Sequence, residues 1–178
     1  MAIRQIRAEQ WVPADLPDVF HFFADPHNLP RIMPGALQAR LENLKIVPPE
    51  VMPEGHNSPV AGVGSEVLLS FRLLPCLPAR ARWLARIVEF EWNSYFVDVQ
   101  ARGPFRAVRH RHGFREESRN GRSGTVIEDL LGYDVGWGVA GSGAGLLLIH
   151  PILQRSFEYR HRAVEQLFGA AGPLPGAH

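Results

Sequence analysis

The stretch LLLIHPILQRSFEYRHRAVEQLF, residues 146–168, predicts the longest helix of the chain and with it the kind of fold. Large apolar side chains recur along it at the spacing of one helical face. They are Ile149, Leu153, Phe157, Val164 and Phe168. At 1.5 Å per residue such a helix is about 30 Å long, roughly the width of a small domain. A helix of this length needs a wide apolar surface to cover its apolar face.

The segments before this helix have the lengths and compositions of β-strands. Seven strands are expected, at residues 3–12, 37–47, 67–74, 81–90, 95–101, 107–117 and 125–134. The later strands are joined by short connections, which predicts antiparallel neighbours in a meander. Only the last helix is long enough to cover one face of such a sheet. A sheet that curls around a helix can leave a cavity between the two.

Two short helices are expected after the first strand. Asp15 stands as an N-cap before the segment that carries Val19, Phe20 and Phe23. Asp25 and Pro26 give a second helix start immediately afterwards, and a Pro-Gly pair ends it.

Three segments lack a regular pattern. Residues 48–64 are rich in proline and glycine, and a loop of this length is usually either functional or disordered. A gate over a pocket and a simple surface excursion therefore both stay open. Residues 136–145 hold five glycines and are expected to form a flexible link into the last helix. The tail at residues 170–178 is expected to be disordered, so that residues 1–169 form the single domain.

Composition narrows the classes of protein to consider. A chain of 178 residues with a formal net charge of +1 fits one domain with a sizeable core. The single cysteine, Cys76, cannot form an intramolecular disulfide and fits a reducing compartment. No signal peptide and no apolar run of membrane-spanning length is visible. We therefore expect a cytoplasmic protein without a membrane span.

Arginines are concentrated between residues 102 and 122. Such a run is either a surface for nucleic acid or anionic lipid, or a solvated face of a strand. No aromatic interleaving or recognised nucleic-acid motif accompanies it. We expect a solvated face and no nucleic-acid partner, and the sequence leaves a homodimer open.

The order of elements resembles the α+β helix-grip fold of the START/birch-pollen-allergen superfamily, also called SRPBCC, which includes polyketide cyclases and lipid-transfer proteins. The resemblance rests on an ordered series of stretches that spans nearly the whole chain. They are VFHFFADPHNLPRI at 19–32, FVDVQ at 96–100, GPF at 103–105, HRHGF at 110–114, GT at 124–125, Asp129, Tyr133 and FEYR at 157–160. The later stretches are similar to a bacterial branch of ligand-binding proteins without an assigned function.

The resemblance implies a curved antiparallel sheet of about seven strands wrapped around the long C-terminal helix, with two short helices after the first strand. It also implies a cavity for a small, largely apolar molecule, such as a lipid or a polyketide-like aromatic compound. It does not imply one reaction, since the same fold serves carriers, receptors and enzymes.

Strand alternation predicts which side chains face the cavity. In residues 107–115 the arginines occupy one side, and His110, His112 and Phe114 occupy the other. Arginines belong in water unless they are paired, so the two histidines should point inward. Asp129 and Tyr133 share one face of the next strand. For residues 95–101 alternation does not decide between the face of Phe96 and Asp98 and the face of Val97 and Val99.

The last helix contributes two more polar candidates. Arg160 and His161 lie within or beside its apolar stripe. A buried arginine needs a partner, and either Asp129 or a ligand carboxylate would serve. The candidate ligand-binding residues are His110, His112, Phe114, Asp129, Tyr133, Phe157, Arg160, His161 and Trp83.

Three interpretations of the polar candidates compete. They can satisfy one another and fix the sheet to the helix. They can recognise a small hydrophobic ligand, which is the function we favour. They can also catalyse a reaction of the cyclase or dehydratase type, with His110 or His112 as a general base oriented by Asp129, and Tyr133 polarising a carbonyl.

A metal site is a further interpretation of the His-x-His pair. Its two imidazoles share one side of a strand, and Asp129 could be a third ligand. Two histidines without a definite third or fourth ligand do not define a metal site. From the sequence we expect no metal and no cofactor.

Overall fold

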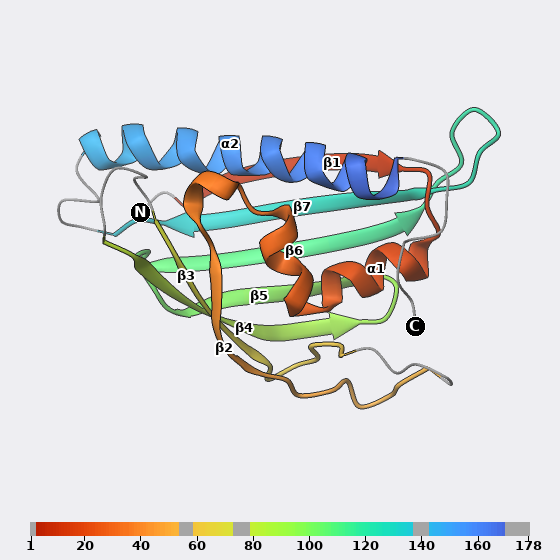
Figure 1. Cartoon of the computed structure of the whole chain (residues 1–178), viewed down its shortest axis with the longest axis horizontal. Coiled ribbons are helices and arrows are strands. Elements are labelled where there is room, and N and C mark those ends of the chain that lie inside the picture. The colour runs from red at the N-terminus through yellow and green to blue at the C-terminus, as the bar shows by residue number, and fades with distance from the viewer. Residues whose placement is uncertain (1–2, 54–58, 73–78, 137–142, 170–178) are drawn as a thin grey trace.

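The computed structural model describes residues 3–53, 59–72, 79–136 and 143–169, and it shows a curved sheet with one long helix lying along it (Figure 1). The elements in chain order are β1 Arg4–Val12, α1 Leu16–Ala24, η1 Pro26–Ile32, η2 Gly35–Leu37, β2 Arg40–Lys45, β3 Glu66–Phe71, β4 Ala81–Glu91, β5 Tyr95–Arg102, β6 Ala107–Glu116, β7 Thr125–Asp134 and α2 Gly143–Phe168. The η elements are 3₁₀ helices. The predicted helix-grip architecture is confirmed.

The sheet has seven strands in the order β1-β7-β6-β5-β4-β3-β2. Every neighbouring pair is antiparallel. The register shifts within β4–β5 at two places and within β2–β3 at one place. Irregularities of this kind bend strands and increase their twist. The sheet therefore curves, and α2 lies lengthwise along it (Figure 1).

The two helical segments after β1 differ from the prediction in detail. Asp15 occupies the N-cap position of α1, but its side chain makes no capping hydrogen bond. Asp25 does cap the next segment, since its carboxylate accepts from the backbone N–H of His27. That segment is a 3₁₀ helix rather than an α-helix, and it contains Pro30. Proline has no N–H to donate, which disfavours continuous α-helical bonding there.

The strand expected at residues 37–47 is shorter than predicted. Its first part forms the 3₁₀ turn η2, and the strand β2 covers only Arg40–Lys45. Gln38 ends the turn with a left-handed backbone at φ 44°, which an extended strand cannot contain. The last helix begins at Gly143, earlier than the predicted residue 146.

The described parts of the 48–64 loop are attached to the body of the domain. The N–H of Ala61 donates to the carbonyl of Ala24 at 3.0 Å, and the N–H of Gly62 donates to that of Val47 at 2.8 Å. A Cβ on Gly62 would lie 2.7 Å from the backbone nitrogen of Pro49, so this contact needs glycine. The Trp92 indole donates to the carbonyl of Val51 at 2.5 Å.

Several sequence predictions lie outside the described residues. They concern the tail at 170–178, the centre of the long loop at 54–58, the turn around Cys76, the end of the third predicted strand and the glycine link at 137–142.

The core has two parts. The larger part lies between α1, η1 and the end of α2, and Phe20 is fully buried at its centre. Phe20 makes edge or tilted ring contacts with Phe90, Trp92, Phe96 and Phe114. The smaller part lies between the sheet and the first half of α2, around Val108, Leu131 and Tyr133. The two parts support α2 at both ends.

The arginines of β6 lie on the outer face of the sheet. Arg109 pairs with Glu89 at 2.7 Å, and Arg115 pairs with Glu117 and with Glu128. The guanidinium of Arg111 lies 4.5 Å from the ring centre of Tyr95. Alternation therefore directs the other side of β6 toward α2, as predicted.

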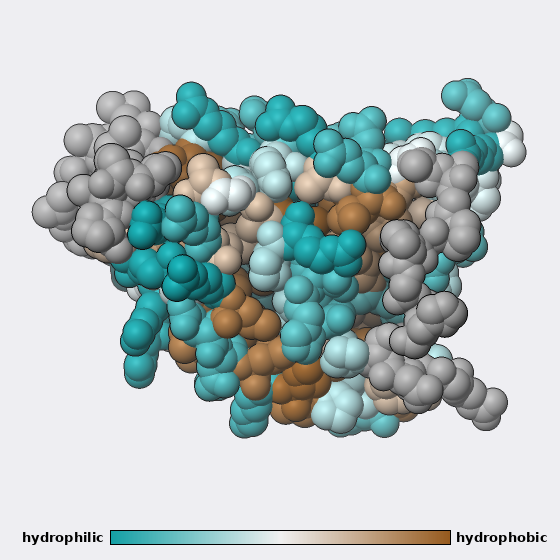
Figure 2. All heavy atoms as spheres, in the orientation of Figure 1, coloured by the Kyte–Doolittle hydropathy of each residue, from teal (hydrophilic) through white to brown (hydrophobic). Residues whose placement is uncertain are grey.

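Among the residues that the structure describes, no helix combines the length and the apolar character that a membrane crossing needs. Polar residues follow the outer side of α2, and hydrophobic residues are visible below it (Figure 2).

Replacing Phe20 with Ala should lower the free energy of unfolding by about 3–5 kcal/mol, because the change removes a fully buried ring and leaves a cavity. Urea unfolding followed by circular dichroism measures this loss. Leu130→Ala is the matched control, since Leu130 is 40% exposed. A Phe20 variant as stable as the Leu130 variant would contradict this assignment of the core.

Candidate functional site

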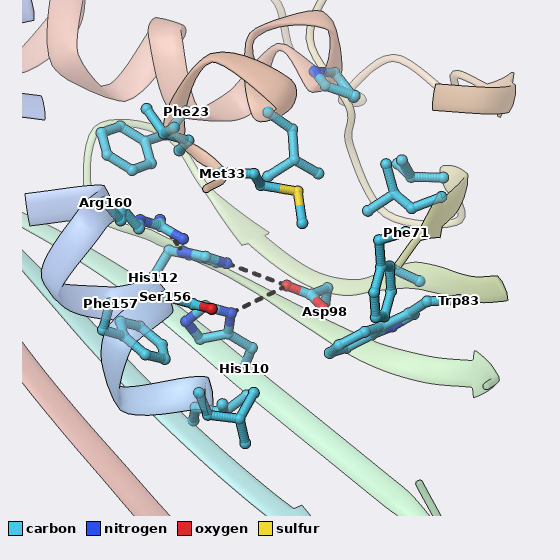
Figure 3. A pocket seen from close by; sticks show the side chains of 18 of the residues that line it. Phe23, Met33, Phe71, Trp83, Asp98, His110, His112, Ser156, Phe157 and Arg160 are labelled. Atoms are coloured by element: carbon cyan, nitrogen blue, oxygen red, sulfur yellow. Dashed lines mark hydrogen bonds and ion pairs between the residues drawn. The ribbon is translucent and has the colours of Figure 1, made fainter. Parts of the chain in front are cut away.

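Strand register brings four polar side chains together beneath α2. In the β5–β6 pair Asp98 lies opposite His110. In the β6–β7 pair His112 lies opposite Asp129. The side chains of a cross-strand pair that share one face are close enough to interact. Arg160 of α2 completes this polar cluster, which consists of Asp98, His110, His112, Asp129 and Arg160. Figure 3 shows its members other than Asp129.

One oxygen of Asp129 is the meeting point of three nitrogens. Its Oδ1 lies 2.9 Å from His110 Nε2, 2.9 Å from His112 Nδ1 and 3.2 Å from Arg160 Nη2. The Asp129 side chain is only 7% exposed. A buried carboxylate has to be paired and hydrogen-bonded, and here donors from β6 and α2 do both. Asp129 therefore links the sheet to the helix.

The opposite edges of the two imidazoles face Asp98. Oδ2 of Asp98 lies 3.1 Å from His112 Nε2 and 4.0 Å from His110 Nδ1. The first distance is a hydrogen bond, whereas the second is too long for one. The ring centres of the two histidines are 3.8 Å apart. Each histidine thus lies between two carboxylates, and Nδ1 of His110 is not bonded to either.

The surroundings separate the pKa values of the two histidines. Burial and the neighbouring charge of His112 lower the pKa of His110. Burial also disfavours charge on His112, but hydrogen bonds to Asp129 and Asp98 outweigh it and raise its pKa. Burial would raise the pKa of Asp129, but Arg160 and the two histidines hold it well below its usual range.

Four members of this cluster, all except Asp129, line one wall of a cavity of about 310 Å³ between the sheet, η1 and α2. Asp98, His110, His112 and Arg160 point toward one another, and Phe71 and Trp83 lie on the other side (Figure 3). Most other lining residues are apolar. They include Phe22, Leu29, Ile32, Leu69, Ile87, Phe96, Leu131, Leu153 and Phe157.

Two residues of the cavity lining carry a buried N–H group that lacks a partner among the described residues. The groups are Nε of Arg160 and Nε1 of Trp83. A buried donor without a partner costs free energy, about 1–3 kcal/mol in typical cases. An acceptor on a bound molecule can supply the missing bonds.

The structure brings only some of the predicted site residues to the cavity. His110, His112, Phe157, Arg160 and Trp83 line it. Asp129 lies behind the histidines and holds their outer edges.

Three other candidates lie elsewhere. Phe114 packs in the larger core against Phe20 and Phe23. Tyr133 is 1% exposed and its hydroxyl lies 2.7 Å from Nδ1 of His150, outside the cavity lining. His161 is exposed, and its backbone carbonyl accepts a bond from Gln10.

Two polar residues of this region were not among the sequence candidates. Asp98 was left undecided because both faces of β5 carry apolar side chains. In the structure both faces of β5 are buried there, with Phe96 at 6% exposure on one face and Val97 at 0% on the other. His150 was missed because its partner Tyr133 lies on another element, and only the placement of α2 brings them together. For Asp98 the available signal was the pairing of its strand with the His-x-His strand.

Comparisons with known proteins extend this description. Neither protein-family models nor curated protein sequences give a match to the chain. Solved structures do match it over nearly its whole length. One is TTHA0849 from Thermus thermophilus, with a TM-score of 0.63, 19% identity and coverage of 96% of this chain and 100% of the other.

Two further structures agree. A START superfamily protein from Mycobacterium smegmatis has a TM-score of 0.62, 12% identity and coverage of 94% and 99%. The chain has the START-like helix-grip fold. Ara h 8.0201 has a TM-score of 0.56, 14% identity and coverage of 93% and 97%. The fold resemblance stated from the sequence is therefore confirmed.

Replacing Arg160 with Met should cost about 3–5 kcal/mol of unfolding free energy, because it removes the cation from a buried ion pair and leaves Asp129 short of a donor. The double variant Arg160→Met/Asp129→Asn should lose less than the sum of its two single variants. Urea unfolding of the four proteins gives this coupling.

Arg109→Met is the control for that cycle, because its ion pair with Glu89 is about half exposed. Exposed pairs contribute about 0–1 kcal/mol. Additive effects of the Arg160 and Asp129 substitutions would show that the two residues do not depend on each other.

Proposed function

We propose that the chain binds one small, largely hydrophobic molecule in the cavity beneath α2. The observation that carries this proposal is an apolar cavity with a single polar wall. Small-molecule sites usually combine hydrophobic lining with a few convergent polar groups that fix orientation. A volume of about 310 Å³ is at the lower end of the range for such sites, about 300–1,000 Å³. One small ligand fits this description better than a large one.

The polar groups define the ligand further. The donors without a partner among the described residues are Arg160 Nε and Trp83 Nε1. Nδ1 of His110 lies 4.0 Å from Asp98 and can accept a hydrogen bond when that imidazole is neutral. The ligand we infer is therefore an apolar molecule with hydrogen-bond acceptors, such as a fatty acid or a polyketide-like aromatic compound. Its acceptor end would lie against Arg160, and its apolar body would contact Ile87, Leu131 and Phe157.

In this proposal residues 1–169 act as one cytoplasmic domain with a small hydrophobic molecule as its partner. The structural neighbours support the proposal through their shared fold, and one of them is described as a START superfamily protein.

Filling the cavity should abolish binding. Ala85 lines the cavity on β4, and Ala85→Trp would place a large ring in it. We expect the variant to bind the apolar fluorescent anion 1-anilinonaphthalene-8-sulfonate at least tenfold more weakly than the parent chain. Fluorescence titration measures this affinity, and native mass spectrometry of the purified protein tests for a co-purified molecule.

Ala101→Trp is the matched control, because Ala101 is exposed on the neighbouring strand. Circular dichroism should show both variants folded. Equal probe affinity for the parent chain and both variants would place the binding elsewhere and refute the proposal.

An enzyme of the cyclase or dehydratase type is the second candidate. It is favoured by two imidazoles that line an apolar cavity and are oriented by carboxylates, an arrangement that suits general acid–base catalysis. His110 or His112 would move a proton on a polyketide-like substrate, with Asp129 holding the rings. Tyr133 would not take part, since its hydroxyl is bonded to His150.

Substitution of the histidines separates the two functions. In a carrier, His110→Gln and His112→Gln should leave probe affinity largely unchanged. In an enzyme they should lower turnover by about 10²–10⁴-fold. Mass spectrometry of a triketide thioester incubated with each protein measures turnover, and absence of any conversion by the parent chain would count against the enzyme.

A further inference from the structure

We propose that Asp98, His110 and His112 form a binding site for one divalent transition-metal ion, of which zinc fits best, with an open coordination position facing the cavity. The ligand atoms would be Oδ2 of Asp98, Nδ1 of His110 and Nε2 of His112.

The three ligand atoms already converge. One donor atom from each residue lies within 4.8 Å of the other two. Asp98 Oδ2 is 3.1 Å from His112 Nε2 and 4.0 Å from His110 Nδ1. Ligand atoms around tetrahedral zinc, each about 2.0–2.1 Å from the ion, lie about 3.3 Å apart. The two measured distances fall on either side of that value, so small side-chain rotations would complete the site.

A metal ion would engage one more of these atoms than a proton does. In the neutral tautomer whose Nδ1 accepts from Arg160, Nε2 of His112 donates to Oδ2 of Asp98. In the other tautomer, with Nδ1 donating to Asp129, Nε2 and Oδ2 face each other as two acceptors at 3.1 Å. A proton between them resolves that pair, but it leaves Nδ1 of His110 unbonded at 4.0 Å. A metal ion at the same place takes all three lone pairs at once.

The second layer around this site matches what metal-binding histidines require. A ligating imidazole usually donates its other N–H to a carboxylate, which fixes its tautomer and orientation. Here the outer nitrogens of both histidines lie 2.9 Å from the same oxygen of Asp129. Arg160 in turn pairs with that carboxylate at 3.2 Å. Asp129 is thus the positioning residue, and Asp98 is the third ligand.

The donor set decides the class of metal. Two imidazoles and one carboxylate suit zinc and its first-row neighbours, whereas calcium and magnesium prefer sites made of oxygen alone. Three protein ligands are typical of sites that keep a position for water or substrate. All three residues line the cavity, so that position would face the bound molecule. An oxygen donor on the hydrophobic ligand would then be its anchor.

Metal binding at Nε2 of His112 would place the proton of that ring on Nδ1, so that Arg160 would keep only its contact with Asp129. Nη2 of Arg160 contacts His112 at Nδ1, at 3.0 Å, on the edge of the ring away from Nε2. Arg160 also pairs with Asp129. Among the three proposed ligands, the carboxylate of Asp98 is then the one that brings a negative charge to the metal ion. The sequence lacked a definite third ligand because alternation could not orient β5, and the structure supplies that ligand.

The test uses the full chain without an affinity tag, treated with a chelator and then freed of it. Titration with Co²⁺ alone should give visible d–d absorption of tetrahedral intensity that saturates at one equivalent, and Zn²⁺ should displace it. Asp98→Asn should weaken Zn²⁺ binding at least tenfold, and Asp129→Asn should weaken it about 10–100-fold as a lost positioning residue.

His161→Ala is the control, since His161 is an exposed histidine of α2 outside the cluster, and it should bind as the parent does. Absence of a one-equivalent Co²⁺ or Zn²⁺ site in the parent chain overturns the proposal, whatever the variants do. Equal Zn²⁺ affinity in the parent and in a folded Asp98→Asn protein also overturns it.

Failure of the metal proposal can be distinguished from failure of the hydrophobic-ligand proposal. The fluorescent anion should bind the chelated, metal-free chain as well, because apolar burial does not need the ion. Probe binding without a metal site removes only the metal proposal, and a metal site without probe binding removes only the hydrophobic-ligand proposal.

Discussion

The carboxylate of Asp129 is the constraint on which this site depends. It lies on β7, it holds both histidines of β6, and it pairs with the guanidinium of α2. Without the helix the carboxylate would lose its cation, and without the carboxylate Arg160 would be a buried charge without a counterion. The sheet and the helix are therefore joined by a charge pair as well as by apolar packing.

That junction also shapes the cavity. Apolar contacts support α2 near Phe168 and near Ile149, and between these ends the helix turns Phe157 and Arg160 toward the sheet. Full packing of this region would need large apolar residues in place of the polar cluster. Histidines and carboxylates instead bond to one another within one wall, and an apolar space remains beside them. The same residues thus hold the helix and define a polar end for a bound molecule.

The fold and four of the five members of this cluster could be predicted from the sequence. The arginines of β6 belong on the solvent side of the sheet, so alternation predicts that His110 and His112 point inward. Alternation on β7 predicts the same inward face for Asp129. Asp98 could not be placed, because β5 is central and apolar on both sides, with Phe96 and Val97 both buried. Periodicity carries no information where the two faces do not differ.

The helix was harder to predict in detail. Successive residues of an α-helix are rotated by about 100° about its axis, which separates Arg160, with a side chain only 13% exposed, from exposed His161. The inward direction of Tyr133 followed from alternation, but its hydroxyl is bonded to His150 of α2. Only the three-dimensional placement of α2 decides which polar group faces the cavity and which is already paired.

The most direct measurement of the central claim, that the cavity beneath α2 is the binding site, is an NMR experiment on methyl-labelled protein saturated with 1-anilinonaphthalene-8-sulfonate. The account predicts intermolecular NOEs from the probe to the methyl groups of Ile87, Leu131 and Leu153, which line the cavity. NOEs confined to the exposed methyl groups of Ile3, Val51 and Val63 would contradict it.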